Sequence, residues 1–143
     1  ALLKDRLRVL GADHPDTLTT RHNLASAVLM AGDPVRAVGL FEALPEDMVR
    51  VLGADHPDTL DARTGFALAV LMAGDPVRAV GLFKALLVDM LRVLGADHPH
   101  TLAAGVGFTL AVRGLVTRGG LRSGLRRCWK TWRGWFGRTV PTP

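Results

Sequence analysis

The residues best suited to chemistry in this sequence are histidine–aspartate pairs. Each pair stands in the motif Ala-Asp-His-Pro, with the histidines at His14, His56 and His98, 42 residues apart. Imidazole and carboxylate groups are common zinc ligands. However, packed helices lie roughly 10 Å apart, whereas the ligands of one zinc ion each lie about 2 Å from it. If the motif repeats along stacked helices, its copies cannot share an ion. We therefore predict a structural role in the linker and at the helix start, and no metal site, although His98 with His100 could hold a stray ion.

Other catalytic patterns are weak. Ser26 and Ser123 are the only serines, and neither lies in a nucleophile elbow. The single cysteine, Cys128, excludes a disulfide framework and a multi-thiolate metal site within the chain. The C-terminal glycines lack the Lys-Ser/Thr ending of a phosphate-binding loop. We predict that the protein is not an enzyme and needs no cofactor. A reducing, cytoplasmic setting is expected, since no signal peptide and no membrane-spanning apolar run is visible.

The dominant feature is an internal repeat. The decapeptide VLGADHPDTL occupies 9–18 and 51–60, and a near copy occupies 93–102. Comparison of 9–50 with 51–92 gives 32 identities and 10 differences. The first eleven residues match the end of the later units, so we expect the chain to begin inside a repeat that lies mostly upstream. The predicted organisation is a repeat array over 1–112 (a partial repeat at 1–11, repeats at about 12–53 and 54–95, and a third from 96 to 112 onward) and a tail at 113–143.

Each unit is predicted to contain two helices. The first helix covers about 15–31, 57–73 and 99–113, and the second covers about 34–52 and 76–94. Proline suits the first position of a helix, and glycine suits the position just after its end. Pro45 is the exception, because it lies inside a second helix and should kink or break it. The expected inward stripes are Leu18, Leu24, Ala25 and Val28 on the first helix, and Ala37, Phe41, Leu44, Met48 and Val51 on the second.

This pattern resembles tetratricopeptide repeats, in the 42-residue form of kinesin light chains and many bacterial regulatory proteins. The resemblance rests on Leu24-Ala25, Gly32, Ala37, Phe41 and the linker 53–58, with counterparts in each copy. It implies an all-α, right-handed superhelical array of helix-turn-helix repeats. It also implies that the concave side, lined by the first helix of each repeat, binds peptides or protein segments. In kinesin light chains an asparagine before the Leu-Ala pair clamps the peptide backbone. Of the three equivalent positions in this sequence, only Asn23 carries that asparagine, whereas the other two are Gly65 and Gly107.

The positions that vary between copies point to the same surface. Six of the ten differences lie within 19–26, and positions 19, 22, 23 and 26 share one helical face. The predicted partner-binding residues are Thr19, His22, Asn23, Ser26, Asp61, Thr64, Leu68, Val106 and Leu110. This face becomes more apolar toward the C-terminus, which suits an apolar ligand or another part of the same protein. The alternative is relaxed drift at solvent-exposed positions.

The tail differs from the array in charge. Residues 1–112 carry a net charge of −3, whereas 113–143 carry +8 with no acidic residue. Its helical pattern combines basic and aromatic side chains, Arg122, Arg126, Arg127, Trp129, Lys130, Trp132 and Arg133. It could cap the array as a divergent last helix, bind nucleic acid or an anionic membrane, or be the product of a shifted reading frame. The sequence thus favours a scaffold for a protein or peptide partner, with tail-driven nucleic-acid or membrane association as the alternative. It leaves the oligomeric state open.

Overall fold

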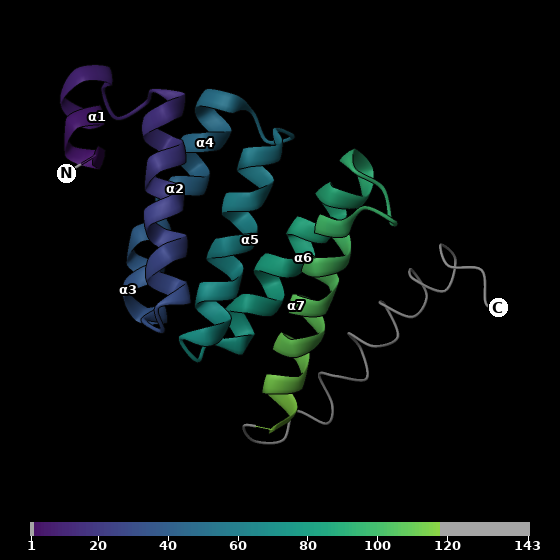
Figure 1. The fold of residues 1–143 in the computed structure, drawn as a ribbon. Coiled ribbons are helices and arrows are strands. Elements are labelled where there is room, and N and C mark those ends of the chain that lie inside the picture. Colours follow the sequence, from purple (N-terminus) through teal and green to yellow (C-terminus); the bar gives the residue numbers. More distant parts are fainter. Residues whose placement is uncertain (1, 118–143) are drawn as a thin grey trace.

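The computed structural model describes residues 2–117, which form an all-α array (Figure 1). Its helices are α1 (Leu2–Leu10), α2 (Pro15–Met30), α3 (Pro34–Phe41), α4 (Leu44–Leu52), α5 (Pro57–Met72), α6 (Pro76–Val93) and α7 (Pro99–Thr117). The predicted fold class is confirmed. The helix bounds agree with the prediction within about a residue, except that α7 runs four residues past 113. Apart from Arg113, the basic and tryptophan residues of the predicted tail lie outside the described residues.

The first helix of each repeat begins where the sequence places its proline. Pro15 and Pro57 occupy the first turn of α2 and α5, where a missing N–H leaves no bond unmade. The preceding histidine caps each helix, because the Nδ1 atoms of His14 and His56 accept hydrogen bonds of 3.1 Å from backbone N–H groups two residues on. His98 does the same at the start of α7, at 3.2 Å. The repeated histidine is therefore a helix cap, which confirms the predicted role of the motif at the helix start.

Pro45 divides the second helix of the first repeat. The helix ends at Phe41 as α3 and resumes at Leu44 as α4, because proline has no N–H to donate and its ring collides with the carbonyl four residues back. In the next repeat Leu87 stands at the equivalent position, and α6 is continuous from residue 76 to 93. The predicted break is confirmed, and it is specific to one copy.

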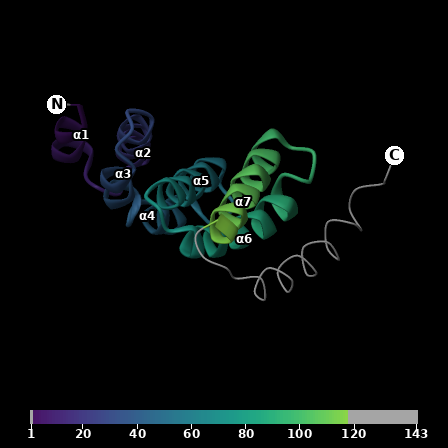
Figure 2. The same cartoon turned by 90° about the horizontal axis from the view of Figure 1, so that it is seen from below.

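The helices form two layers, which Figure 2 shows from below. The first helices, α2, α5 and α7, lie in one layer, and α3, α4 and α6 lie in the other. The interior between them is filled by leucine, methionine and two almost fully buried rings, Phe41 and Phe83. Most of the predicted inward residues are buried, namely Leu18, Ala25, Ala37, Phe41, Leu44 and Met48, whereas Val28 and Val51 are half-buried.

The prediction of the inward stripe is wrong for one residue, Leu24. Leu24 is 39% exposed, although its counterparts Phe66 and Phe108 are 9% and 8% exposed. Phe66 lines the same pocket as Pro45 of the preceding repeat. On the corresponding side of α2 the described chain supplies only α1, none of whose residues is buried. This position of the inward stripe is thus buried only where a complete preceding repeat packs against it.

Ion pairs at equivalent positions tie the two layers together. Arg21 on α2 contacts Asp47 on α4 at 2.8 Å, and Arg63 on α5 contacts Asp89 on α6 at 2.6 Å. The pKa of the Asp47 carboxyl lies below its ordinary value, chiefly because Arg21 donates a hydrogen bond to it and secondarily because Arg50 does. Each pair is about three-quarters buried, so solvent screens it less than it screens an ordinary surface pair.

Candidate functional site

The predicted partner-binding residues lie on the first-helix layer and reach solvent. We call them the first-helix face: Thr19, His22, Asn23 and Ser26 of α2, Asp61, Thr64 and Leu68 of α5, and Val106 and Leu110 of α7. Helical rotation of about 100° per residue turns them away from the buried side of each helix. Thr19 and Asn23 are exposed, as are Val106 and Leu110, while the others are half-buried. Their assignment to binding stays a prediction.

His22 is more deeply placed than its neighbours on this face. Its ring meets the edge of the Phe41 ring, with centroids 5.8 Å apart and planes at 64°. Its Nδ1 atom is buried and has no hydrogen-bond partner in the described part of the chain. Burial lowers the pKa of His22 below the ordinary 6.5, more than the carboxylates of Asp61 and Asp58 raise it. The ring is therefore neutral at pH 7, and it packs against Phe41 at the base of the face.

Two glycines next to this face have a packing role that the sequence analysis missed. A Cβ atom at Gly65 would stand 2.7 Å from Cζ of Phe41, and one at Gly107 would stand 2.5 Å from Cε1 of Phe83. Each phenylalanine thus reaches the first helix of the following repeat only because that helix has no side chain there. The departure of these positions from the clamp asparagine therefore makes room for a core ring. Pairing each phenylalanine with the glycine 24 residues later in the sequence would have revealed this.

Asp61 joins α5 to α7. Its carboxylate lies 2.8 Å from Nδ1 of His100, and both side chains are about half exposed. His100 occupies the position of Asp58 in the preceding copy, so this contact belongs to one repeat boundary. The ring of His100 also meets that of His98, with centroids 5.1 Å apart. Within residues 2–117, no cluster of three or more metal-binding side chains is present.

The C-terminal part of the face is apolar, as the sequence indicated. Leu102, Val106 and Leu110 follow one another at four-residue steps on α7, and their exposed fractions are 54%, 60% and 46%. The predicted cap by Trp129 and Trp132 concerns residues outside the described range, and it stays a prediction.

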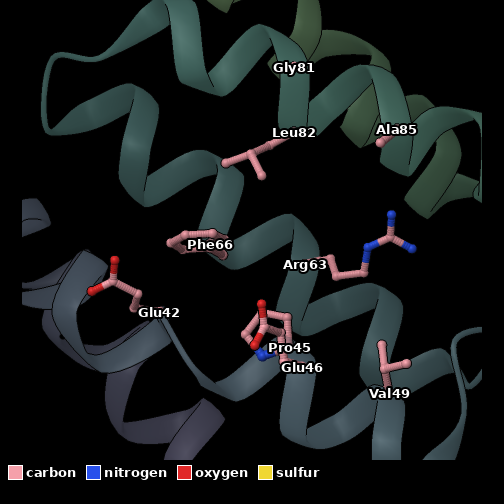
Figure 3. Close-up of a pocket in the computed structure, with 9 residues that line it drawn as sticks. All are labelled: Glu42, Pro45, Glu46, Val49, Arg63, Phe66, Gly81, Leu82 and Ala85. Carbon is pink, nitrogen blue, oxygen red and sulfur yellow. The ribbon is translucent and has the colours of Figure 1, made fainter.

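A pocket lies on the other side of α5. It has a volume of about 380 Å³ and is lined by Glu42, Pro45, Glu46, Val49, Arg63, Phe66, Gly81, Leu82 and Ala85. Arg63 and Phe66 project from α5 roughly opposite to Asp61 and Thr64, since each residue turns the helix by about 100°. Figure 3 shows both side chains between the α3–α4 segment and α6. The sequence analysis did not identify this site, because its walls come from two repeats.

Comparison with known proteins agrees with this architecture. Residues 17–58 match the family model described as tetratricopeptide repeat. Two solved structures from Podosopora anserina superimpose on this chain with TM-scores of 0.68. They are of a protein described as a kinesin light chain with nearly identical TPR-like repeats. Their sequence identities are 24% and 23%, over 98% and 94% of this chain. The chain spans 64% and 63% of the length of those structures. No curated protein matches.

The fold and the match together define a class, the helical repeat arrays built from paired helices. Within that class, the helix pairs resemble tetratricopeptide repeats, and residues 17–58 match the model of that family. Tetratricopeptide repeats generally mediate protein–protein interactions. Among the described helices, none combines the length and the hydropathy that a membrane span requires.

Proposed function

We propose that this protein is an interaction scaffold that binds a peptide or protein segment along the first-helix face. One observation carries the proposal. The two complete copies differ at ten of 42 positions, and six of these lie within eight residues of the first helix. Positions 19, 22, 23 and 26 share one solvent-accessible side of α2, and the counterparts of 19, 22 and 26 lie on the same side of α5, whereas Gly65 packs against Phe41. A framework that stays fixed while one accessible face changes is expected of a modular binding protein.

The face favours a ligand with a polar half and an apolar half. At the α2 end, the exposed amide of Asn23 can donate to and accept from a peptide backbone. This side chain makes no hydrogen bond within residues 2–117, so the amide is available. At the α7 end, Val106 and Leu110 offer apolar surface that gains free energy when a ligand removes it from water. An extended segment with apolar side chains at one end would fit both.

The test is a selection of random dodecapeptides on the full chain, followed by affinity measurements on variants. Asn23→Ala and Val106→Asp should each weaken binding of the selected peptides about tenfold or more. Val77→Asp is the matched control, because Val77 on α6 is 67% exposed, close to the 60% of Val106, but lies in the other layer. If no peptide is selected, or if Val77→Asp weakens binding as much as Val106→Asp does, the proposal is wrong.

The same assay separates the tail-driven alternative. Contacts with phosphate groups weaken steeply as salt concentration rises, whereas burial of apolar side chains does not. Binding to the first-helix face should therefore change little between low and physiological salt.

A further inference from the structure

The four remaining differences between the two complete copies meet in one place. They are Glu42, Pro45, Glu46 and Val49, which correspond to Lys84, Leu87, Val88 and Leu91 in the next copy. These residues are spread over eight positions of the sequence and over the break between α3 and α4. All four nevertheless line the pocket against α5 and α6, which we call the α4–α6 pocket. Outside the first helix, the copies thus differ only where they line this pocket.

The shape of the pocket depends on this copy-specific sequence. Pro45 ends α3 early, and its ring forms part of the wall together with Val49. Opposite them, a Cβ atom at Gly81 would meet no heavy atom within 4 Å, so the α6 wall is open there. Phe66 forms the floor between the two walls, and Leu82 points toward it (Figure 3).

The charges around the pocket leave a negative excess. Arg63 is engaged by Asp89 at 2.6 Å, so its charge is compensated. Arg78 lies over the Phe66 ring, 5.2 Å from its centroid, and approaches Glu42 at 3.8 Å. Glu46, by contrast, is exposed and has no hydrogen bond or ion pair within residues 2–117. The arrangement of Arg78 also shows that the Phe66 ring accepts a guanidinium group, since cations favour the face of an aromatic ring.

We propose that the α4–α6 pocket is a second protein-binding site, which takes a lysine or arginine side chain from a basic, apolar-flanked segment of a partner protein. The aliphatic stem of such a side chain packs on Phe66 and Leu82, and its charged head reaches the carboxylate of Glu46. Lysine and arginine combine these two properties, an apolar stem and a cationic head. Charge complementarity selects this occupant over an acidic or wholly apolar one.

The site is independent of the first-helix face. The two surfaces project from roughly opposite sides of α5, and they involve different residues. The acidic lining of the pocket is also specific to one copy, because the next copy replaces Glu42 by Lys84 and Glu46 by Val88. A basic ligand would meet a positive charge and no carboxylate at that equivalent position.

The experiment uses the full chain and two dodecapeptide libraries, one with a fixed central lysine and one with a central methionine. Methionine has a similar length without the charge. The key variant is Glu42→Lys with Glu46→Val, which carries the residues found at the equivalent positions of the second copy. We expect the lysine library to yield peptides that bind the unaltered protein and whose affinity for this variant is about tenfold or more lower. They should also lose a similar factor when their own lysine is replaced by methionine.

Two further variants test whether these peptides bind at the α4–α6 pocket. Val106→Asp on the first-helix face should leave the affinity of these peptides unchanged. Pro45→Leu keeps both carboxylates but rebuilds the wall as in α6, and it should weaken binding. The proposal is overturned if the libraries yield no peptide that depends on Glu46, or if methionine-centred peptides bind equally well. It is also overturned if Val106→Asp abolishes the binding. None of these results depends on whether the first-helix face binds a ligand.

Discussion

A single methyl group added at Gly107 should destabilise the array, although alanine favours a helix more than glycine does. Gly107 lies in the middle of α7, where its Cβ atom would stand 2.5 Å from Cε1 of Phe83 and closer still to Cζ. The Phe83 ring is only 1% exposed, so it is enclosed by the core and cannot retreat into solvent. The substitution Gly107→Ala therefore opposes helix propensity to overpacking.

The magnitudes decide the sign. Replacing an interior helical glycine by alanine stabilises a helix by about 1 kcal/mol. Overpacking a well-filled core costs about 1–3 kcal/mol. The upper part of that range applies here, because a contact of normal length requires the enclosed ring to move by roughly 1 Å. We expect a net destabilisation of about 1–2 kcal/mol. Gly105→Ala, two residues earlier in α7, meets no heavy atom within 4 Å and should stabilise by up to about 1 kcal/mol.

The assay is urea unfolding followed by the helical circular dichroism signal, with the midpoint and slope fitted for each variant. An unchanged slope would show that the variants differ in stability rather than in the extent of folding. A second-site test uses Phe83→Leu, which removes the ring. In that background Gly107→Ala should lose most of its penalty, because the two changes act through one contact. If Gly107→Ala stabilised the protein as much as Gly105→Ala does, the packing of Phe83 against α7 would be refuted.

Three further substitutions test the core, the break in the second helix and the half-buried His22. Phe83→Ala should lower the unfolding free energy by about 3–5 kcal/mol, as for other buried rings, and a loss below about 1 kcal/mol would show that the ring is not buried. Pro45→Leu should raise it by about 1–2 kcal/mol by restoring a continuous helix, which an increase in helical signal would verify. Burial lowers the pKa of His22 in the folded chain. As the pH falls below about 6.5, His22 therefore binds a proton in the unfolded chain before it does so in the folded chain. Stability should thus decline from about pH 7 toward pH 5, and His22→Gln should remove that part of the decline in urea titrations at each pH.

The sequence predicted the local features of the fold well. Proline and glycine at the helix ends act within a single turn, so Pro15, Gly32 and Pro45 could be interpreted without knowledge of distant residues. All five glycines at positive φ in the described chain occupy the ends of first or second helices. The overall architecture followed from the 42-residue period, because stacked units are the means by which such helix pairs bury their apolar stripes.

The contacts between units could not be predicted in the same way. Phe41 meets Gly65 and Phe83 meets Gly107, and both contacts cross from one repeat to the next. The exposure of Leu24 likewise depends on what lies against α2 rather than on its place in the helical pattern. Hydrophobic periodicity shows which side of a helix is buried, but not which neighbour buries it. The candidate residues of the first-helix face were identified from variation between copies, and their role in binding stays a prediction.

The distribution of that variation bears on the choice between binding and drift. Relaxed drift predicts changes at solvent-exposed positions throughout the repeat. Met30 and Val35 are 88% and 71% exposed, yet both are identical in the next copy, at Met72 and Val77. The changes fall instead on the first helix and on the walls of the α4–α6 pocket, including the buried Pro45. Exposure alone does not select these positions, whereas most of them fall on the first-helix face or line the α4–α6 pocket, as two proposed binding surfaces predict.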